Sequence, residues 1–133
     1  MIDIEAQVIT RVRSAVIGTY PTIKVKSVDD LTEQDLPCLV IAQTDNRIRE
    51  DMISSSELEN GTIQTFELTA YDNTPGTARS TAKAIFGLAD AEMTAMGFTR
   101  VTMLTLPTQN VTVARIFGRY QATVDKNEII YRR

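Results

Sequence analysis

The chain has 133 residues, a length typical of one domain, and it contains 43% hydrophobic and 23% charged residues, as folded proteins do. Its net charge of −3 argues against a protein that binds nucleic acid by neutralising phosphates over a broad surface. Because histidine is absent, the commonest general base near neutral pH and the commonest metal ligand are both missing, which excludes triads and imidazole metal sites.

The sequence also bears on where the protein is located. Its one cysteine, Cys38, cannot form an internal disulfide and lies in an apolar run, where a thiol usually behaves as a small buried hydrophobe. The first residues are acidic where a signal peptide needs a basic region, and no run approaches the roughly 20 apolar residues of a membrane span. We therefore expect an intracellular protein that is neither exported by that route nor embedded in a membrane.

Residues 3–17 are predicted to form an amphipathic helix, because apolar residues recur there at spacings of three and four. Asp3 can cap the start of this helix, and Gly18 supplies its end. Residues 23–28 alternate between apolar and polar types, which predicts a half-buried strand whose lysines face water. The apolar run at 38–43 predicts an interior strand that is buried on both faces.

A long polar excursion is predicted between residues 45 and 61, which are rich in charged side chains and serine and end in an Asn-Gly pair. Loops of more than about 12–15 residues are uncommon in compact domains unless they are functional or disordered. This excursion is therefore a candidate contact arm, and the alternative is a merely mobile loop. The residues proposed for contact are Arg47, Arg49, Glu50, Asp51 and Met52.

Residues 62–72 are predicted to form a strand that turns Phe66, Leu68 and Ala70 toward the core. A helix is expected to follow at once, with Asn73 or Thr74 as its cap and Pro75 in its first turn, and to end at Gly97. Inside this helix, Gly87 costs about 1 kcal/mol relative to alanine, and we expect it to relieve a tight contact.

The last third of the chain is predicted to be β structure, with strands at 98–106, 111–125 and 128–131. In the long middle strand, alternate residues from Ala114 to Val124 share one face, and the opposite face carries two arginines around an aromatic ring. Such a mixed patch suits contacts with protein or nucleic acid, although an ordinary solvent-facing sheet surface is the alternative. The residues of this candidate lumen or partner-contact face are Arg115, Phe117, Arg119 and Gln121.

These elements predict an α+β fold in which two helices pack on one mixed or antiparallel sheet, with the order α-β-β-β-α-β-β-β in a single domain over residues 1–133. The six glycines form no phosphate-binding loop, and the adjacent acidic residues lie in expected loops without calcium-loop spacing. We therefore predict no catalytic residue, no cofactor and no metal site.

The order of elements and several segments resemble the tail-terminator, or neck, proteins of long-tailed bacteriophages. The resemblance covers nearly the whole chain and is carried by the strand 66–72 running into an alanine-rich helix, by residues 115–124, and by the ending Ile130-Tyr131-Arg132-Arg133. It implies a virion protein, assembled in the host cytoplasm, that forms a hexameric ring on the head-proximal end of the tail tube. The ring would halt tube polymerisation and join the tail to the capsid connector.

The partners that this resemblance implies are further copies of the chain, the tail-tube protein and the head–tail connector proteins. DNA passing through the ring would come near Arg115 and Arg119 if these residues lined the lumen, and would then be attracted without sequence reading. A small α+β module that binds a ligand or a protein is the alternative function, and it predicts an apolar pocket with a few converging polar groups. An enzyme is the third hypothesis, and no nucleophile arrangement supports it.

Overall fold

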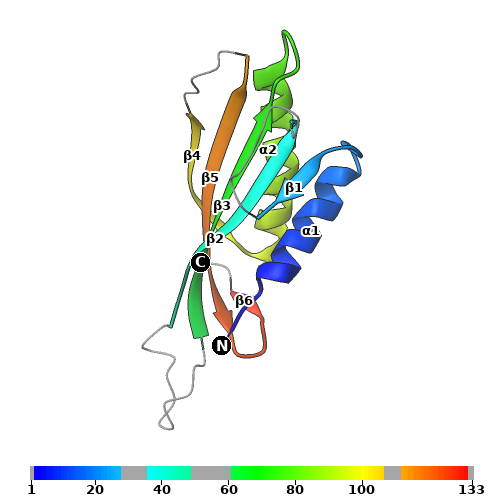
Figure 1. Cartoon of the computed structure of the whole chain (residues 1–133). Coiled ribbons are helices and arrows are strands. Elements are labelled where there is room, and N and C mark those ends of the chain that lie inside the picture. Colours follow the sequence, from blue (N-terminus) through cyan, green and yellow to red (C-terminus); the bar gives the residue numbers. More distant parts are fainter. Residues whose placement is uncertain (1, 28–35, 49–60, 107–111, 132–133) are drawn as a thin grey trace, which may run out of the picture.

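The computed structural model describes residues 2–27, 36–48, 61–106 and 112–131 (Figure 1). Two helices and six strands follow one another in the predicted α-β-β-β-α-β-β-β order, which confirms the α+β fold class. In chain order the elements are α1 (Glu5–Ile17), β1 (Lys24–Lys26), β2 (Cys38–Ile48), β3 (Gly61–Asp72), α2 (Ala78–Met96), β4 (Thr99–Leu106), β5 (Ala114–Asp125) and β6 (Ile130–Tyr131).

The strands form one mixed sheet in the order β1-β2-β3-β5-β4, in which β1 is parallel to β2 and the other pairs are antiparallel. Strand β5 pairs with β3 along its whole length, so its other side is left for both β4 and β6. The pairs Thr99↔Gln121 and Tyr131↔Thr123 place β6 directly beyond β4 on that side. One edge of the sheet is therefore formed by β4 and β6, and the other by β1.

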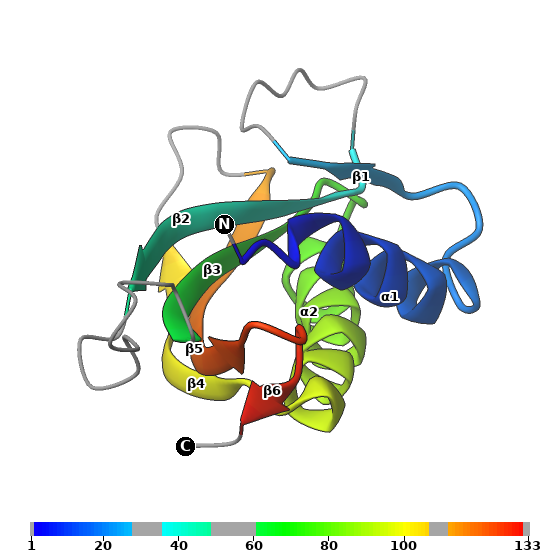
Figure 2. The same ribbon diagram turned by 90° about the horizontal axis from the view of Figure 1, so that it is seen from below.

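Both helices lie on the same face of the sheet, as Figure 2 shows. The core forms between this face and the helices, because α1 and α2 each carry an apolar stripe. The alternation predicted for the strands is confirmed, since Phe66 and Leu68 of β3 and Ile116 and Tyr120 of β5 are all fully buried in this core. A further set of core residues comes from α1 and α2: Val8, Val12, Val16, Ala82, Ile85, Phe86, Ala89 and Met93.

Two glycines show where backbone space matters in this packing. A Cβ at Gly118 of β5 would lie 2.4 Å from Cζ of Phe86, so the missing side chain lets α2 approach the sheet closely. Gly87 of α2 has no neighbouring atom within 4 Å of the position that a Cβ would take. The prediction that Gly87 relieves a tight contact is therefore wrong, because this residue lies on the exposed side of the helix.

The ends of the helices partly follow the predictions. Asp3 accepts a hydrogen bond from the backbone N–H of Glu5 at 3.0 Å, close to the start of α1. Helix α2 ends at Gly97 as predicted, with the left-handed φ of 111° that glycine tolerates best. Its start is three or four residues later than expected, because the Asp72 carboxylate accepts hydrogen bonds from the N–H and hydroxyl of Thr74 and holds a turn there.

Strand β2 extends further than its apolar run indicated. Asp45, Asn46 and Arg47 pair with Thr65, Gln64 and Ile63 of β3, so the predicted excursion at 45–61 is wrong over residues 45–48 and at Gly61. The reason is that this part of β2 is largely exposed to solvent, so a polar sequence is compatible with the strand. Arg47 is thus a strand residue, whereas Arg49, Glu50, Asp51 and Met52 of the predicted arm lie outside the described residues.

A buried polar cluster holds the first residues of the chain against β2 and β3. The amide of Gln64, which is fully buried, donates to the carbonyl of Ile2 at 3.2 Å and to the hydroxyl of Thr62 at 3.0 Å. Gln43 donates to the Gln64 oxygen at 2.8 Å, and Asn46 donates to the same Ile2 carbonyl at 2.8 Å. These bonds satisfy polar groups away from water and fix the N-terminal segment beside the sheet.

Candidate functional site

The face of the sheet opposite the helices, called the open face below, collects the residues predicted for partner contact. Strand register places Arg115, Phe117, Arg119 and Gln121 of β5 on this face, beside Tyr71, Thr69, Glu67 and Thr65 of β3. On the other side of β5 it places Leu104 and Leu106 of β4, opposite Phe117 and Arg115. The predicted grouping of the four β5 residues on one face is confirmed; their role stays a prediction.

Arg119 is held by contacts within the open face. Its Nη2 lies 3.2 Å from Oε2 of Glu67, and its guanidinium carbon lies 5.9 Å from the centre of the Phe117 ring. Gln121 donates a hydrogen bond to the hydroxyl of Thr65 at 3.2 Å. The positive charge of Arg119 therefore has a carboxylate and an aromatic face as neighbours, which reduces what it can offer to a distant phosphate.

A hollow of about 270 Å³ lies in the open face. Its walls are mainly apolar and aromatic, with one arginine and one carboxylate among them, and they come from four adjacent strands. The lining residues are Val40, Ala42, Glu67, Thr69, Tyr71, Leu106, Arg115 and Phe117. Sequence reasoning singled out Arg115 and Phe117 but missed the others, because only the strand order brings β2, β3 and β4 to the same place.

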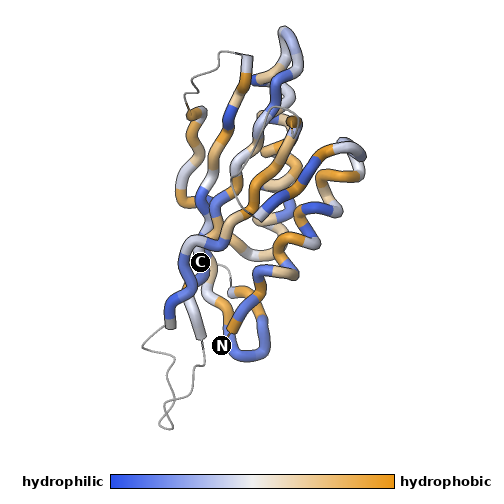
Figure 3. Tube along the Cα trace, viewed as in Figure 1, coloured by the Kyte–Doolittle hydropathy of each residue, from blue (hydrophilic) through white to orange (hydrophobic). Residues whose placement is uncertain are grey.

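The edge formed by β4 and β6 carries exposed apolar side chains. Among the described residues, the large hydrophobic side chains that are exposed are Val101, Met103, Leu104, Ile129 and Tyr131, with 37–52% of their surface accessible. All five belong to β4, β6 or the residue before β6. Figure 3 colours much of β4 as hydrophobic. The sequence did not predict this exposed edge, because the side chains of β4 are exposed only as a result of the position of the strand at the border of the sheet.

The opposite edge of the sheet has a different character. Strand β1 has only three residues, and the two lysines at its ends flank a half-buried Val25 that packs on the core. A short edge strand with lysines resists pairing with other chains, whereas a long apolar edge strand invites it. Strand β4 spans eight residues, and its one charged residue, Arg100, is already paired with Asp90 of α2 at 3.2 Å.

The Asp125 carboxylate positions the end of this edge. It accepts hydrogen bonds from the N–H groups of Asn127 and Ile129 and from the hydroxyl of Tyr131, each at 2.9 Å. The bond from Ile129, supported by those from Tyr131 and Asn127, lowers the pKa of Asp125 below its usual range. The turn between β5 and β6 is thereby closed, and it places Ile129 and Tyr131 in line with β4.

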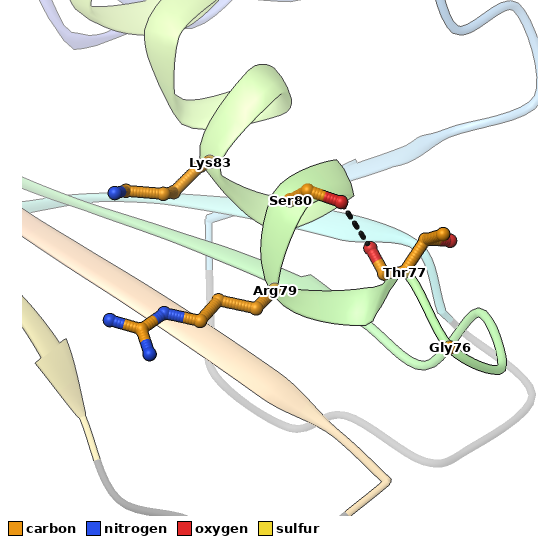
Figure 4. Close-up of a pocket in the computed structure, with 5 residues that line it drawn as sticks. All are labelled: Gly76, Thr77, Arg79, Ser80 and Lys83. Carbon is orange, nitrogen blue, oxygen red and sulfur yellow. Dashed lines mark hydrogen bonds between the residues drawn. The ribbon is translucent and has the colours of Figure 1, made fainter.

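A second hollow, of about 350 Å³, lies at the start of α2 and is lined by Gly76, Thr77, Arg79, Ser80 and Lys83 (Figure 4). A helix start with two basic residues attracts anions. The Ser80 hydroxyl is engaged with the carbonyl of Thr77 at 3.0 Å, and Figure 4 shows that Arg79 and Lys83 extend away from these two residues. The polar groups therefore do not converge on one point.

Other kinds of site find no support within the part of the chain that the structure describes. No group of three or more acidic or cysteine side chains there could hold a metal ion. None of the described helices is long and apolar enough to cross a membrane. Cys38 is fully buried, as its apolar surroundings predict.

Because comparisons with known proteins give no match, a function for this chain has to be argued from its geometry. Neither protein-family models nor curated proteins give a match to this chain. The open face and the β4–β6 edge are therefore the two features on which a function has to be argued.

Proposed function

We propose that this protein is a structural assembly subunit that associates with copies of itself into a ring, at the head-proximal end of the tail of a long-tailed bacteriophage. In that place the ring ends polymerisation of the tail tube and joins the tail to the capsid connector. The protein acts through fitting surfaces and breaks no covalent bond. Its station in the virion rests on the sequence resemblance, and its self-association rests on the edge described above.

The observation that carries self-association is the gathering of exposed apolar side chains along β4 and β6. Val101 is 52% exposed, and Leu104 and Tyr131 are each 49% exposed. Apolar surface of this kind is favourable to bury, at about 25 cal/mol per Å². An edge strand also offers unpaired backbone N–H and C=O groups, which a neighbouring chain can satisfy.

The difference between the two edges of the sheet is compatible with a ring. A ring is built from contacts between two different patches of identical subunits. The β4–β6 edge is long and apolar, whereas β1 is short and flanked by lysines. A subunit with two such unlike sides can bring its apolar edge against a different surface of the next copy.

The proposal is tested by placing a charge on the apolar edge. Leu104→Lys in β4 should lower the mass of the assembly in light scattering, because lysine is costly to bury without a partner. Ala84→Lys introduces the same charge at an exposed position of α2 and serves as the control. The station is tested separately by adding the protein to polymerising tail-tube protein of the same virus and measuring tube length in micrographs. Tubes of unchanged length would contradict the proposed station.

A protein-binding module is the second candidate function. It is favoured by the hollow in the open face, where apolar walls surround a few polar groups. This function does not exclude the first, because a ring subunit also contacts other proteins.

A further inference from the structure

Each border of the sheet leaves part of a strand without a partner on its outer side. Strand β1 pairs only with residues 38–40 of β2, and in the described part of the chain no strand pairs with the outer side of residues 41–48. Strand β4 pairs with β5 on one side, and none of the described strands lies on its other side. Both borders therefore offer backbone N–H and C=O groups that a strand of another chain can satisfy.

The two borders run in opposite directions. The neighbouring pairs from β2 through β3 and β5 to β4 are all antiparallel, and three such pairs reverse the direction of the strand. In a cyclic ring all copies have the same orientation relative to the ring axis. Where the strands run along that axis, β4 of one copy therefore meets β2 of the next copy as an antiparallel partner.

Each of these two strands carries one extra residue, and the extra residues lie at the same height in the sheet. Residues 42–45 of β2 are four residues beside only three of β3, residues 65–67. Residues 99–102 of β4 are likewise four residues beside only three of β5, residues 119–121. The two inner segments, 65–67 and 119–121, pair directly with each other. The bulges of the two borders therefore agree in size and in height.

This agreement makes the two borders fit each other better than they fit a regular strand. A bulge disrupts the ladder of hydrogen bonds with a regular strand, and so protects an edge from wrong partners. Two edges with the same extra residue at the same height can instead pair residue for residue. Thr102 then stands opposite Ala42, and both lie on the open face. Arg100, the only charged residue of β4, comes opposite Thr44, so no like charges face each other.

We propose that residues 99–103 of β4 in one copy pair, antiparallel, with residues 41–45 of β2 in the next copy, so that the sheets of neighbouring copies become continuous. The contact ends at residue 40, where β1 already occupies the outer side of β2. This inference rests on the proposed self-association and names the surface that β4 meets, which is β2 of a second copy. The open faces of all copies then form one continuous surface on the same side of the ring wall.

Disulfide cross-linking between copies tests this contact. Residues directly opposite each other in an antiparallel pair have Cα atoms roughly 4.5–5.5 Å apart, a separation that a disulfide can span. The full chain carrying both Thr102→Cys and Ala42→Cys is oxidised with copper phenanthroline and separated on a denaturing gel without reductant. We expect a ladder of covalent multimers. The parent chain, in which Cys38 is fully buried, should stay at the mass of one chain.

The matched control combines Thr102→Cys with Ala84→Cys, whose position on α2 is exposed and far from both borders in the sequence of strands. This control should give no ladder. Asp45→Cys with Thr99→Cys repeats the test at the other end of the contact, where both side chains are exposed, and should also give a ladder. The circular-dichroism spectrum of each variant shows whether it is folded.

Light scattering of the parent chain separates the failure of this inference from the failure of the proposed function. If the parent chain assembles but neither cysteine pair gives a ladder, the β4–β2 contact is overturned and ring formation still stands. Covalent dimers from Thr102→Cys alone would also overturn the contact, because they would place two β4 strands side by side. A parent chain with the mass of one chain at every concentration would overturn both.

Discussion

The same substitution at two glycines should change stability in opposite directions. In Gly118→Ala, the new methyl group would lie 2.4 Å and 2.8 Å from two ring carbons of Phe86, where carbon atoms normally stay about 3.5–4.0 Å apart. The ring has little room to move, because Phe86 is only 2% exposed and packs beside Tyr120. Such overpacking costs about 1–3 kcal/mol, and the stiffer unfolded chain offsets about 0.4–1 kcal/mol of that.

Gly118→Ala should therefore lower the free energy of unfolding by about 1–2 kcal/mol. Gly87→Ala adds its methyl group to open space on the exposed side of α2 and should raise this free energy by about 0.5–1 kcal/mol. The assay is urea unfolding followed by circular dichroism, with equal slopes required for the comparison. A Gly118→Ala protein as stable as the parent chain would refute the close approach of α2 to β5.

Three further outcomes are expected. Because the pKa of Asp125 is lowered in the folded state, its carboxylate stabilises the fold fully above about pH 4, and this stabilisation is lost as the pH falls through the pKa of the folded state. Asp125→Asn should therefore make the urea midpoint depend less on pH in this acidic range. Burial, together with the hydrogen bond to Asp90, raises the pKa of Tyr120 far above its usual value. The parent chain should therefore lose stability as the pH rises above about 10. Tyr120→Phe should lose less stability over the same range, as measured by melting curves at alkaline pH. Gln64→Ala leaves buried partners unsatisfied and should cost about 2 kcal/mol in urea unfolding.

Much of the fold could be predicted from periodicity, because the residues that alternate or recur are the ones that the core buries. Phe66 and Leu68 in β3 are predicted to face the core on this basis, and both are fully buried. The alternation of apolar and polar residues is absent where a strand extends beyond the part of the sheet that the helices cover. Residues 45–48 were consequently assigned to a loop although they continue β2.

The candidate surfaces were predictable only in part. The face of β5 that carries Arg115 and Phe117 follows from alternation within a single strand. The hollow also needs Tyr71 and Leu106, which belong to β3 and β4 and meet β5 only through the strand order. The apolar edge was missed for the same reason, because a strand has the same alternating sequence pattern whether it lies in the middle of a sheet or at its edge.

Association of the chain with copies of itself is the central claim, and the mass of the unsubstituted protein in solution tests it most directly. Light scattering over a range of protein concentrations should give a mass several times that of one chain, and about six times for the hexameric ring. A mass equal to one chain at every concentration, with or without tail-tube protein, would contradict the claim.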